Sequence, residues 1–183
     1  MNRRITLACL TVALTLAAPA AMLADEPTVK IGDTVKSLKF KDIRYLPRSL
    51  EELGEHKAIV FAFLNTTCPL AQRYLPRLKS LHEVYGNQGV QFVAVNVGAA
   101  DSIQDMAAHA LEHDALFPFV KDVSGQCVKA LGVQRTPEVA VLDAKQRLVY
   151  RGRIDDQYRF GGALPKARRH DLEEALKEIC LLY

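Results

Sequence analysis

An uninterrupted apolar segment, residues 58–64, passes directly into a polar turn and then into a helical pattern. Seven consecutive apolar residues predict a strand that is covered on both faces, which places it at the centre of a sheet. After the turn N-T-T-C-P at 65–69, apolar residues recur at helical spacing up to Gly86, and residues 90–97 form a second apolar strand. A strand, a helix and a parallel strand joined by a right-handed crossover are therefore expected here.

Helices and strands are expected to alternate beyond this unit as well. The expected elements are a helix over 103–113 capped by Ser102 and Asp105, a short strand over 116–120, a helix after Gly125, strands over 138–142 and 147–153, and a final amphipathic helix. Residues 28–53 are expected to form an irregular N-terminal extension with a hairpin and a short helix near Leu50. The pattern predicts an α/β fold, a three-layer sandwich around a central mixed β-sheet, because the last two strands form an antiparallel hairpin.

The N-terminus has the outline of a secretory signal. Arg3 and Arg4 precede an apolar run over residues 5–16, and small residues follow. Cleavage after Ala20 fits the pattern, and cleavage after Ala24 fits it better because a polar sequence begins there. The stretch is also about long enough to span a bilayer, so a membrane tether is the alternative if the segment stays uncleaved.

These boundaries define a signal peptide over residues 1–24 and one domain over residues 25–183, with a periplasmic or otherwise exported location. The signal segment contains two of the 24 basic residues and none of the 21 acidic ones, so the remainder is close to neutral. With six Tyr, seven Phe and no Trp, it offers neither a basic face nor a stacking platform. These features argue against binding to nucleic acid.

Cys68 is the residue that most clearly points to chemistry. It lies between the carboxyl end of the first apolar strand and the first turn of the next helix, where unpaired backbone amides favour an anion. The thiolate is the nucleophilic form of cysteine, and Thr66 and Thr67 can add hydroxyl hydrogen bonds. The alternative is a small buried hydrophobic residue, which is common for unpaired cysteine. The polar lead-in and the following Pro69 favour the reactive interpretation.

An exported chain keeps three cysteines, Cys68, Cys127 and Cys180, so at least one stays unpaired within a monomer. Cys127 and Cys180 are the candidates for a thiol that resolves oxidised Cys68. Cys127 is expected to be a core residue more often than a partner, because free cysteine is among the most buried residue types. Cys180 is near the C-terminus, where it could reach Cys68 or a second molecule. The alternative is that it only lies on one face of the last helix.

Three features together resemble the thioredoxin-like superfamily: Cys68-Pro69 after an apolar strand, Pro76 inside the following helix, and Thr136-Pro137 before a hairpin strand. The resemblance is closest to the redoxin branch, the alkyl hydroperoxide reductase and thiol-specific antioxidant proteins. It implies a thioredoxin-like fold, an antioxidant or thiol–disulfide oxidoreductase that works at Cys68, and no cofactor.

The resemblance covers the chain from about Thr28 to its end, and residues 65–71 and 151–157 are similar to redoxin-domain proteins exported by environmental bacteria. It implies that Thr136 and Pro137 share a cis peptide bond beside the reactive sulfur, where the backbone can pair with an extended substrate. Arg151 and Arg153 would stabilise a thiolate or bind an acidic group. The alternative is that these two arginines only face solvent.

The sequence departs from the relatives at positions that matter for mechanism. Thioredoxins have a second cysteine three positions after the first, where this chain has Ala71. Peroxiredoxins have a threonine three residues before the reactive cysteine and a proline four before that, where this chain has Asn65 and Phe61. These departures leave a one-cysteine mechanism, in which Cys68 attacks a disulfide of a protein partner or a hydroperoxide and another thiol resolves the product.

The rival function is a non-catalytic thioredoxin-like module that binds a partner in the same crevice and has lost the second cysteine. A metal site is not expected: His109 and His113 are spaced as a zinc pair on one helix, but the sequence offers no third ligand at a suggestive spacing.

Overall fold

The protein is described by a computed structural model that covers residues 29–159 and 161–182, so the signal peptide predicted for residues 1–24 lies outside the described residues. The strands of the main sheet are β1 (Lys39–Asp42), β2 (Pro47–Ser49), β3 (Ala58–Leu64), β4 (Val90–Asn96), β5 (Phe119–Lys121), β6 (Glu138–Asp143) and β7 (Leu148–Gly152). They lie in the order β2-β1-β5-β4-β3-β6-β7. β4 runs parallel to both β3 and β5, whereas β6 runs antiparallel to both β3 and β7, so the sheet is mixed.

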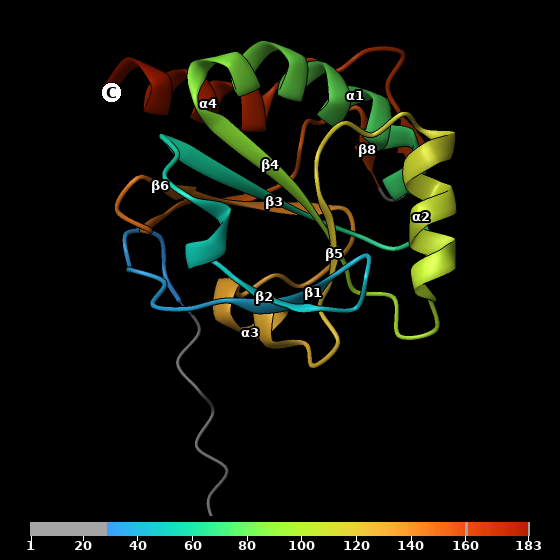
Figure 1. Cartoon of the computed structure of the whole chain (residues 1–183). Helices are drawn as coiled ribbons and strands as arrows, with labels where there is room; N and C mark the ends of the chain where they lie inside the picture. Colours follow the sequence, from blue (N-terminus) through green and yellow to red (C-terminus); the bar gives the residue numbers. More distant parts are fainter. Residues whose placement is uncertain (1–28, 160, 183) are drawn as a thin grey trace, which may run out of the picture.

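Helices cover both faces of this sheet. They are α1 (Pro69–Tyr85), α2 (Ile103–Glu112), α3 (Gln126–Leu131) and α4 (Asp171–Leu182), with short 3-10 turns η1 (Glu51–Leu53) and η2 (Gly86–Gln88). In Figure 1, α1 and α4 lie above the sheet, α3 lies below it, and α2 stands at its side. The predicted α/β sandwich is confirmed.

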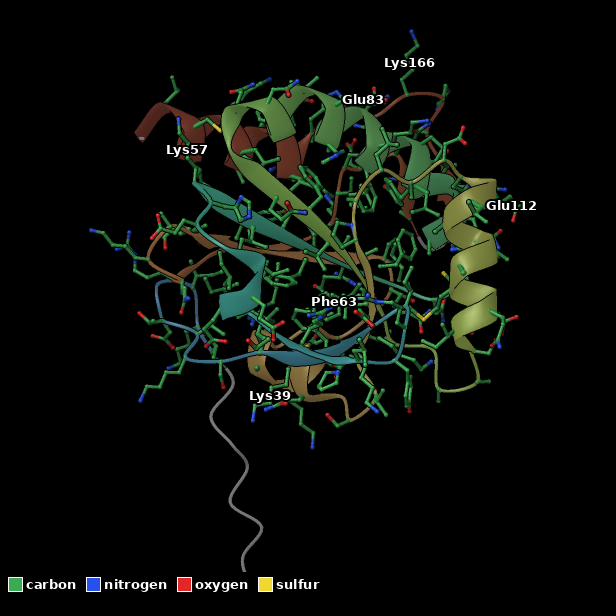
Figure 2. All side chains as sticks on the ribbon, viewed as in Figure 1. Lys39, Lys57, Phe63, Glu83, Glu112 and Lys166 are labelled. Carbon is green, nitrogen blue, oxygen red and sulfur yellow. The ribbon has the colours of Figure 1, made fainter. Side chains whose placement is uncertain are left out.

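β3 shows why the fold needs helices on both faces. All seven of its residues are buried, and their side chains alternate between two separate cores. Val60, Ala62 and Leu64 pack in the core shared with α1 and α4, whereas Phe61 and Phe63 pack in the core shared with α3 and the N-terminal extension. Figure 2 shows Phe63 in the interior of the molecule. The prediction of a central strand with two covered faces is confirmed.

The other predicted elements are close to those observed. The N-terminal extension contains the β1–β2 hairpin and ends in η1, and Ser102 and Asp105 form a capping box at the start of α2. α1 continues through Pro76 as one helix. A small hairpin of β8 (Tyr158–Arg159) and β9 (Gly162–Ala163) precedes α4, and its two-residue strands are too short to leave a periodic pattern in the sequence.

Candidate active site

Cys68 lies where β3 ends and α1 begins. It is the N-cap residue of α1, with the extended backbone angles φ −81° and ψ 113°, and its carbonyl oxygen accepts a hydrogen bond from the amide of Gln72 at 3.1 Å. Pro69 follows at the start of the helix, where its missing N–H removes no helical hydrogen bond. The Cys68 side chain is half-buried: it packs against the core beneath α1 and keeps part of its surface in solvent. The sulfur therefore lies beside the first backbone amides of α1, which have no partner inside the helix.

The loop before β6 forms the opposite wall of the site. The Thr136–Pro137 peptide bond is cis, as the family resemblance implied. The carbonyl oxygen of Thr136 lies 3.9 Å from Cys68 Sγ, within reach of a weak S–H hydrogen bond. The buried Glu138 shapes this loop, because its Oε2 accepts a hydrogen bond from the amide of Gln134 at 2.8 Å. The structure thus brings Cys68 and Thr136 together, 68 residues apart in the chain.

A buried carboxylate, Asp101, holds the turn that leads into Cys68. Its Oδ2 accepts hydrogen bonds from the backbone amide of Thr66 at 2.7 Å and from Asn96 Nδ2 at 2.6 Å. Lys121 Nζ donates to the carbonyl oxygens of Gly98, at 2.8 Å, and Asp101. A Cβ atom on Gly98 would overlap the Asp101 carboxylate, so glycine leaves room for that side chain. The network connects the ends of β3, β4 and β5.

The electrostatics of Asp101 follow from these contacts. Burial by itself raises the pKa of the carboxyl group, but the hydrogen bonds from Thr66 and Asn96, with the nearby charge of Lys121, outweigh it and lower the pKa below its usual value. Asp101 is therefore ionised at neutral pH. No local pattern in the sequence marks Asp101, because its contact with Thr66 spans 35 residues.

Asp101→Ala is expected to reduce the free energy of unfolding by about 2–3 kcal/mol at neutral pH, because the Thr66 amide and the Asn96 side chain lose their buried acceptor. The pKa of Asp101 is lower in the folded than in the unfolded protein, so its stabilisation is complete above about pH 4 and is lost as pH falls through the folded-state pKa. Urea unfolding at several pH values checks both points. A difference from the wild type that grows as pH falls would contradict this account. Glu178→Ala, on the exposed face of α4, should change stability by no more than about 0.5 kcal/mol.

The predicted roles of the two threonines remain predictions. Thr66 is tied to Asp101 through its amide and its side chain, and its carbonyl oxygen accepts a hydrogen bond from Gln72 Nε2 at 2.8 Å. Thr67 is exposed beside Cys68. Thr66 is therefore held within the turn, whereas Thr67 is exposed to solvent.

The two arginines singled out in the sequence have partners away from the sulfur. Arg153 Nε lies 2.6 Å from Asp171 Oδ2 at the start of α4. Arg151 donates to the carbonyl oxygens of Val29 and Leu131, both at 3.0 Å, and so ties the N-terminal extension to the end of α3. The hydrogen bonds and ion pairs described for the two arginines do not include Cys68, so their role at the sulfur stays a prediction.

Neither of the other two cysteines lies beside Cys68. Cys127 is fully buried on the other side of the sheet, and its Sγ donates to the carbonyl oxygen of Lys39 at 3.4 Å. Burial, followed by the charge of Asp122, raises the pKa of the Cys127 thiol to about 12.

Cys180 lies on α4 beside the C-terminal end of α1. Cys180 is close enough to influence Tyr85, the last residue of α1, whose pKa is raised by burial first and then by its neighbours Glu173 and Cys180. Cys68 caps the other end of this 17-residue helix, which is about 25 Å long. The described residues therefore bring neither candidate thiol to Cys68.

The three thiols should differ in their reaction with iodoacetamide. Cys127 is expected to react at least about a hundredfold more slowly in the folded protein than after unfolding in urea, because the thiolate is its reactive form and is suppressed there. Peptide mass spectrometry after timed quenching measures each site separately. Rapid labelling of Cys127 in the folded state would show that this core opens. Cys68 and Cys180, both half-buried, serve as internal references.

Within the described ranges, no group of three or more His, Cys, Asp and Glu side chains is arranged to hold a metal ion. His109 and His113 are in ring contact, with centroids 4.8 Å apart. No helix in the described part of the chain is long and apolar enough to cross a membrane.

The sequence matches a known protein family over most of its length. Residues 30–167 match the Redoxin family model. The thiol-disulfide oxidoreductase ResA of Geobacillus thermodenitrificans is 27% identical over 141 residues, which cover 77% of this chain and 79% of that protein. ResA of Halalkalibacterium halodurans is 26% identical over 144 residues, with coverage of 78% and 80%.

Solved structures show the same fold. A hypothetical protein of Sinorhizobium meliloti superposes with a TM-score of 0.75 at 25% identity, covering 85% of this chain and 86% of that one. A putative thiol:disulfide interchange protein DsbE of Chlorobium tepidum superposes with a TM-score of 0.67 at 18% identity, covering 84% and 99%. Because the family model spans most of the chain and the fold is thioredoxin-like, this protein belongs to the Redoxin family.

Proposed function

We propose that this chain is an exported thiol–disulfide oxidoreductase that works through the single sulfur of Cys68. It is an oxidoreductase of the redoxin type, and its ResA relatives are named as thiol-disulfide oxidoreductases. The observation that carries the proposal is the half-buried Cys68 sulfur at the start of α1, 3.9 Å from the Thr136 carbonyl oxygen. A substrate disulfide can approach the exposed side of that sulfur.

The reaction needs one cysteine of this chain and one thiol from elsewhere. The Cys68 thiolate attacks a sulfur of the substrate disulfide, the substrate S–S bond breaks, and the released half leaves as a thiolate. An external thiol then attacks the mixed disulfide and returns Cys68 to its reduced form. Ala71, at the position of the second cysteine in thioredoxins, is fully buried and has no sulfur to offer, and Cys180 is at the far end of α1.

The loop at Thr136 and Pro137 supplies the contact with the substrate in this proposal. Thr136 and Pro137 are both half-buried, so the wall beside Cys68 keeps accessible surface. An extended substrate segment can pair with this stretch of backbone while its sulfur meets Cys68.

The export part of the proposal rests on the N-terminal sequence. Arg3, Arg4 and the apolar run over 5–16 precede the family match, which begins at residue 30. Cleavage after Ala24 would release a chain that begins just before the Redoxin domain.

Reduction of peroxide has weaker support than disulfide exchange. Asn65 and Phe61 occupy the two positions that distinguish peroxiredoxins, and Phe61 is buried in the core below the sheet. The Oδ1 atom of Asn65 is itself buried without a hydrogen-bond partner among the described residues.

Turnover with a monothiol tests the proposal. The purified protein is incubated with bis(2-hydroxyethyl) disulfide and glutathione, and formation of oxidised glutathione is followed with glutathione reductase and NADPH. Catalysis proportional to protein concentration supports exchange at Cys68. An unchanged background rate would favour the binding module instead. A parallel incubation with hydrogen peroxide and dimedone reports sulfenic acid and separates peroxide reduction from disulfide exchange.

A further inference from the structure

A cleft of about 390 Å³ opens beside the turn that precedes Cys68. Thr66, Thr67 and Gln72 line one wall, and Asp105, His109 and Glu112 on α2 line the other. Thr67 is the residue before Cys68 in the chain, so the cleft reaches the residue that precedes the proposed reactive cysteine. Figure 2 labels Glu112 on α2, at the side of the molecule.

The α2 wall presents one face of the helix. Asp105, His109 and Glu112 are separated by four and three residues, so they lie in a row about 10 Å long. Hydrogen bonds from the Ser102 side chain and backbone lower the pKa of Asp105, and Glu112 is exposed. With Asp101 at its base, the cleft has three acidic residues, and none of the described residues that line it is lysine or arginine.

His109 provides an observation that is independent of the acidic residues. Its side chain lines the cleft and is only 6% exposed, yet Nε2 has no hydrogen-bond partner among the described residues. Burial, followed by the charge of His113, lowers the pKa of His109, so the imidazole is neutral at pH 7. A neutral imidazole with its proton on Nδ1 offers Nε2 as an acceptor, and a buried nitrogen of this kind is normally paired.

We propose that this cleft is a subsite for a lysine or arginine side chain that flanks the reacting cysteine of a protein substrate. The proposal rests on the proposed function of Cys68. A residue one to three positions from the substrate cysteine lies within about 4–11 Å of it along an extended backbone, which matches a cleft that starts at Thr67. The cationic group approaches Asp105 and Glu112 and donates an N–H to His109 Nε2. The chain thereby selects substrates by charge at a point separate from the sulfur.

Peptides that differ in one residue test the subsite. Each peptide has a single cysteine, joined by a disulfide to 5-thio-2-nitrobenzoate, and either Lys, Gln or Glu two positions away. The reduced Cys180→Ser protein is used, so that Cys68 attacks the peptide sulfur and releases the coloured thiolate. At low ionic strength the Lys peptide is expected to react about threefold to fivefold faster than the Glu peptide, with the Gln peptide between them.

Two variants locate the preference. Glu112→Gln is expected to reduce the ratio of Lys to Glu rates at least about twofold. Glu178→Gln makes the same change in net charge on the exposed surface of α4 and should leave the ratio as it is. Equal rates for the three peptides, or an equal effect of both variants, would overturn the subsite and leave exchange at Cys68 intact. If no peptide reacts, the proposed function fails together with the subsite.

Discussion

Cys68→Ser is expected to reduce turnover of a small disulfide by at least about a thousandfold, to the uncatalysed rate. Serine preserves the size of the side chain and the N-cap position of α1, but its hydroxyl is not ionised at neutral pH and does not attack a disulfide. The turnover assay with glutathione, run on both proteins at equal concentration, measures the effect. Urea unfolding of the variant should show nearly wild-type stability, because the sulfur is only half-buried.

Cys180→Ser is the matched control, because it makes the same chemical change at another half-buried thiol. It is expected to retain turnover within about twofold, since α1 separates it from Cys68 by about 25 Å. Loss of turnover in Cys180→Ser with retention in Cys68→Ser would move the chemistry to the opposite end of the molecule and refute the site.

Phe63→Ala is expected to have the largest effect on stability, a decrease of about 3–5 kcal/mol in the free energy of unfolding. Phe63 is fully buried on β3, where it pairs with Val95 of β4 and Glu138 of β6, and its ring fills the core below the sheet. Removal of the ring leaves a cavity in this core, beneath the strand that leads to the site. Urea unfolding followed by circular dichroism gives the change, and an unaltered slope would show that the denatured state is unaffected.

Leu181→Ala provides the comparison for Phe63→Ala. Leu181 is 85% exposed near the end of α4, so truncation there should change stability by no more than about 0.5 kcal/mol. A loss below about 1 kcal/mol in Phe63→Ala would contradict the account of β3 as a strand buried on both faces.

Local patterns were sufficient to predict most of the fold. The seven apolar residues of β3, the helical spacing of α1 and the capping pair Ser102 and Asp105 each depend on neighbours in the chain, and the structure contains all three features. The order of the strands could be predicted only in part. β5 lies between β4 and β1 and joins the N-terminal hairpin to the central sheet, which short strands do not reveal in a sequence.

The site could be predicted less completely, because its contacts are long-range. Cys68 was found from its position at a strand-to-helix corner, which is a local signal. Asp101 holds Thr66 from 35 residues away, and no spacing rule connects them. The position of Cys180 relative to Cys68 likewise depends on how α4 packs against α1, which a helical pattern alone does not determine. Arg153 pairs with Asp171 for the same reason.

The most direct test of the central claim is the rate at which each cysteine reacts with oxidised glutathione in the folded protein. Samples are quenched with acid at timed intervals, and mass spectrometry of peptides gives the glutathione adduct at Cys68, Cys127 and Cys180. We expect Cys68 to form the adduct at least about tenfold faster than Cys180 and to lose it when reduced glutathione is added. An adduct that forms at Cys68 no faster than at Cys180 would contradict the assignment of Cys68 as the reactive sulfur.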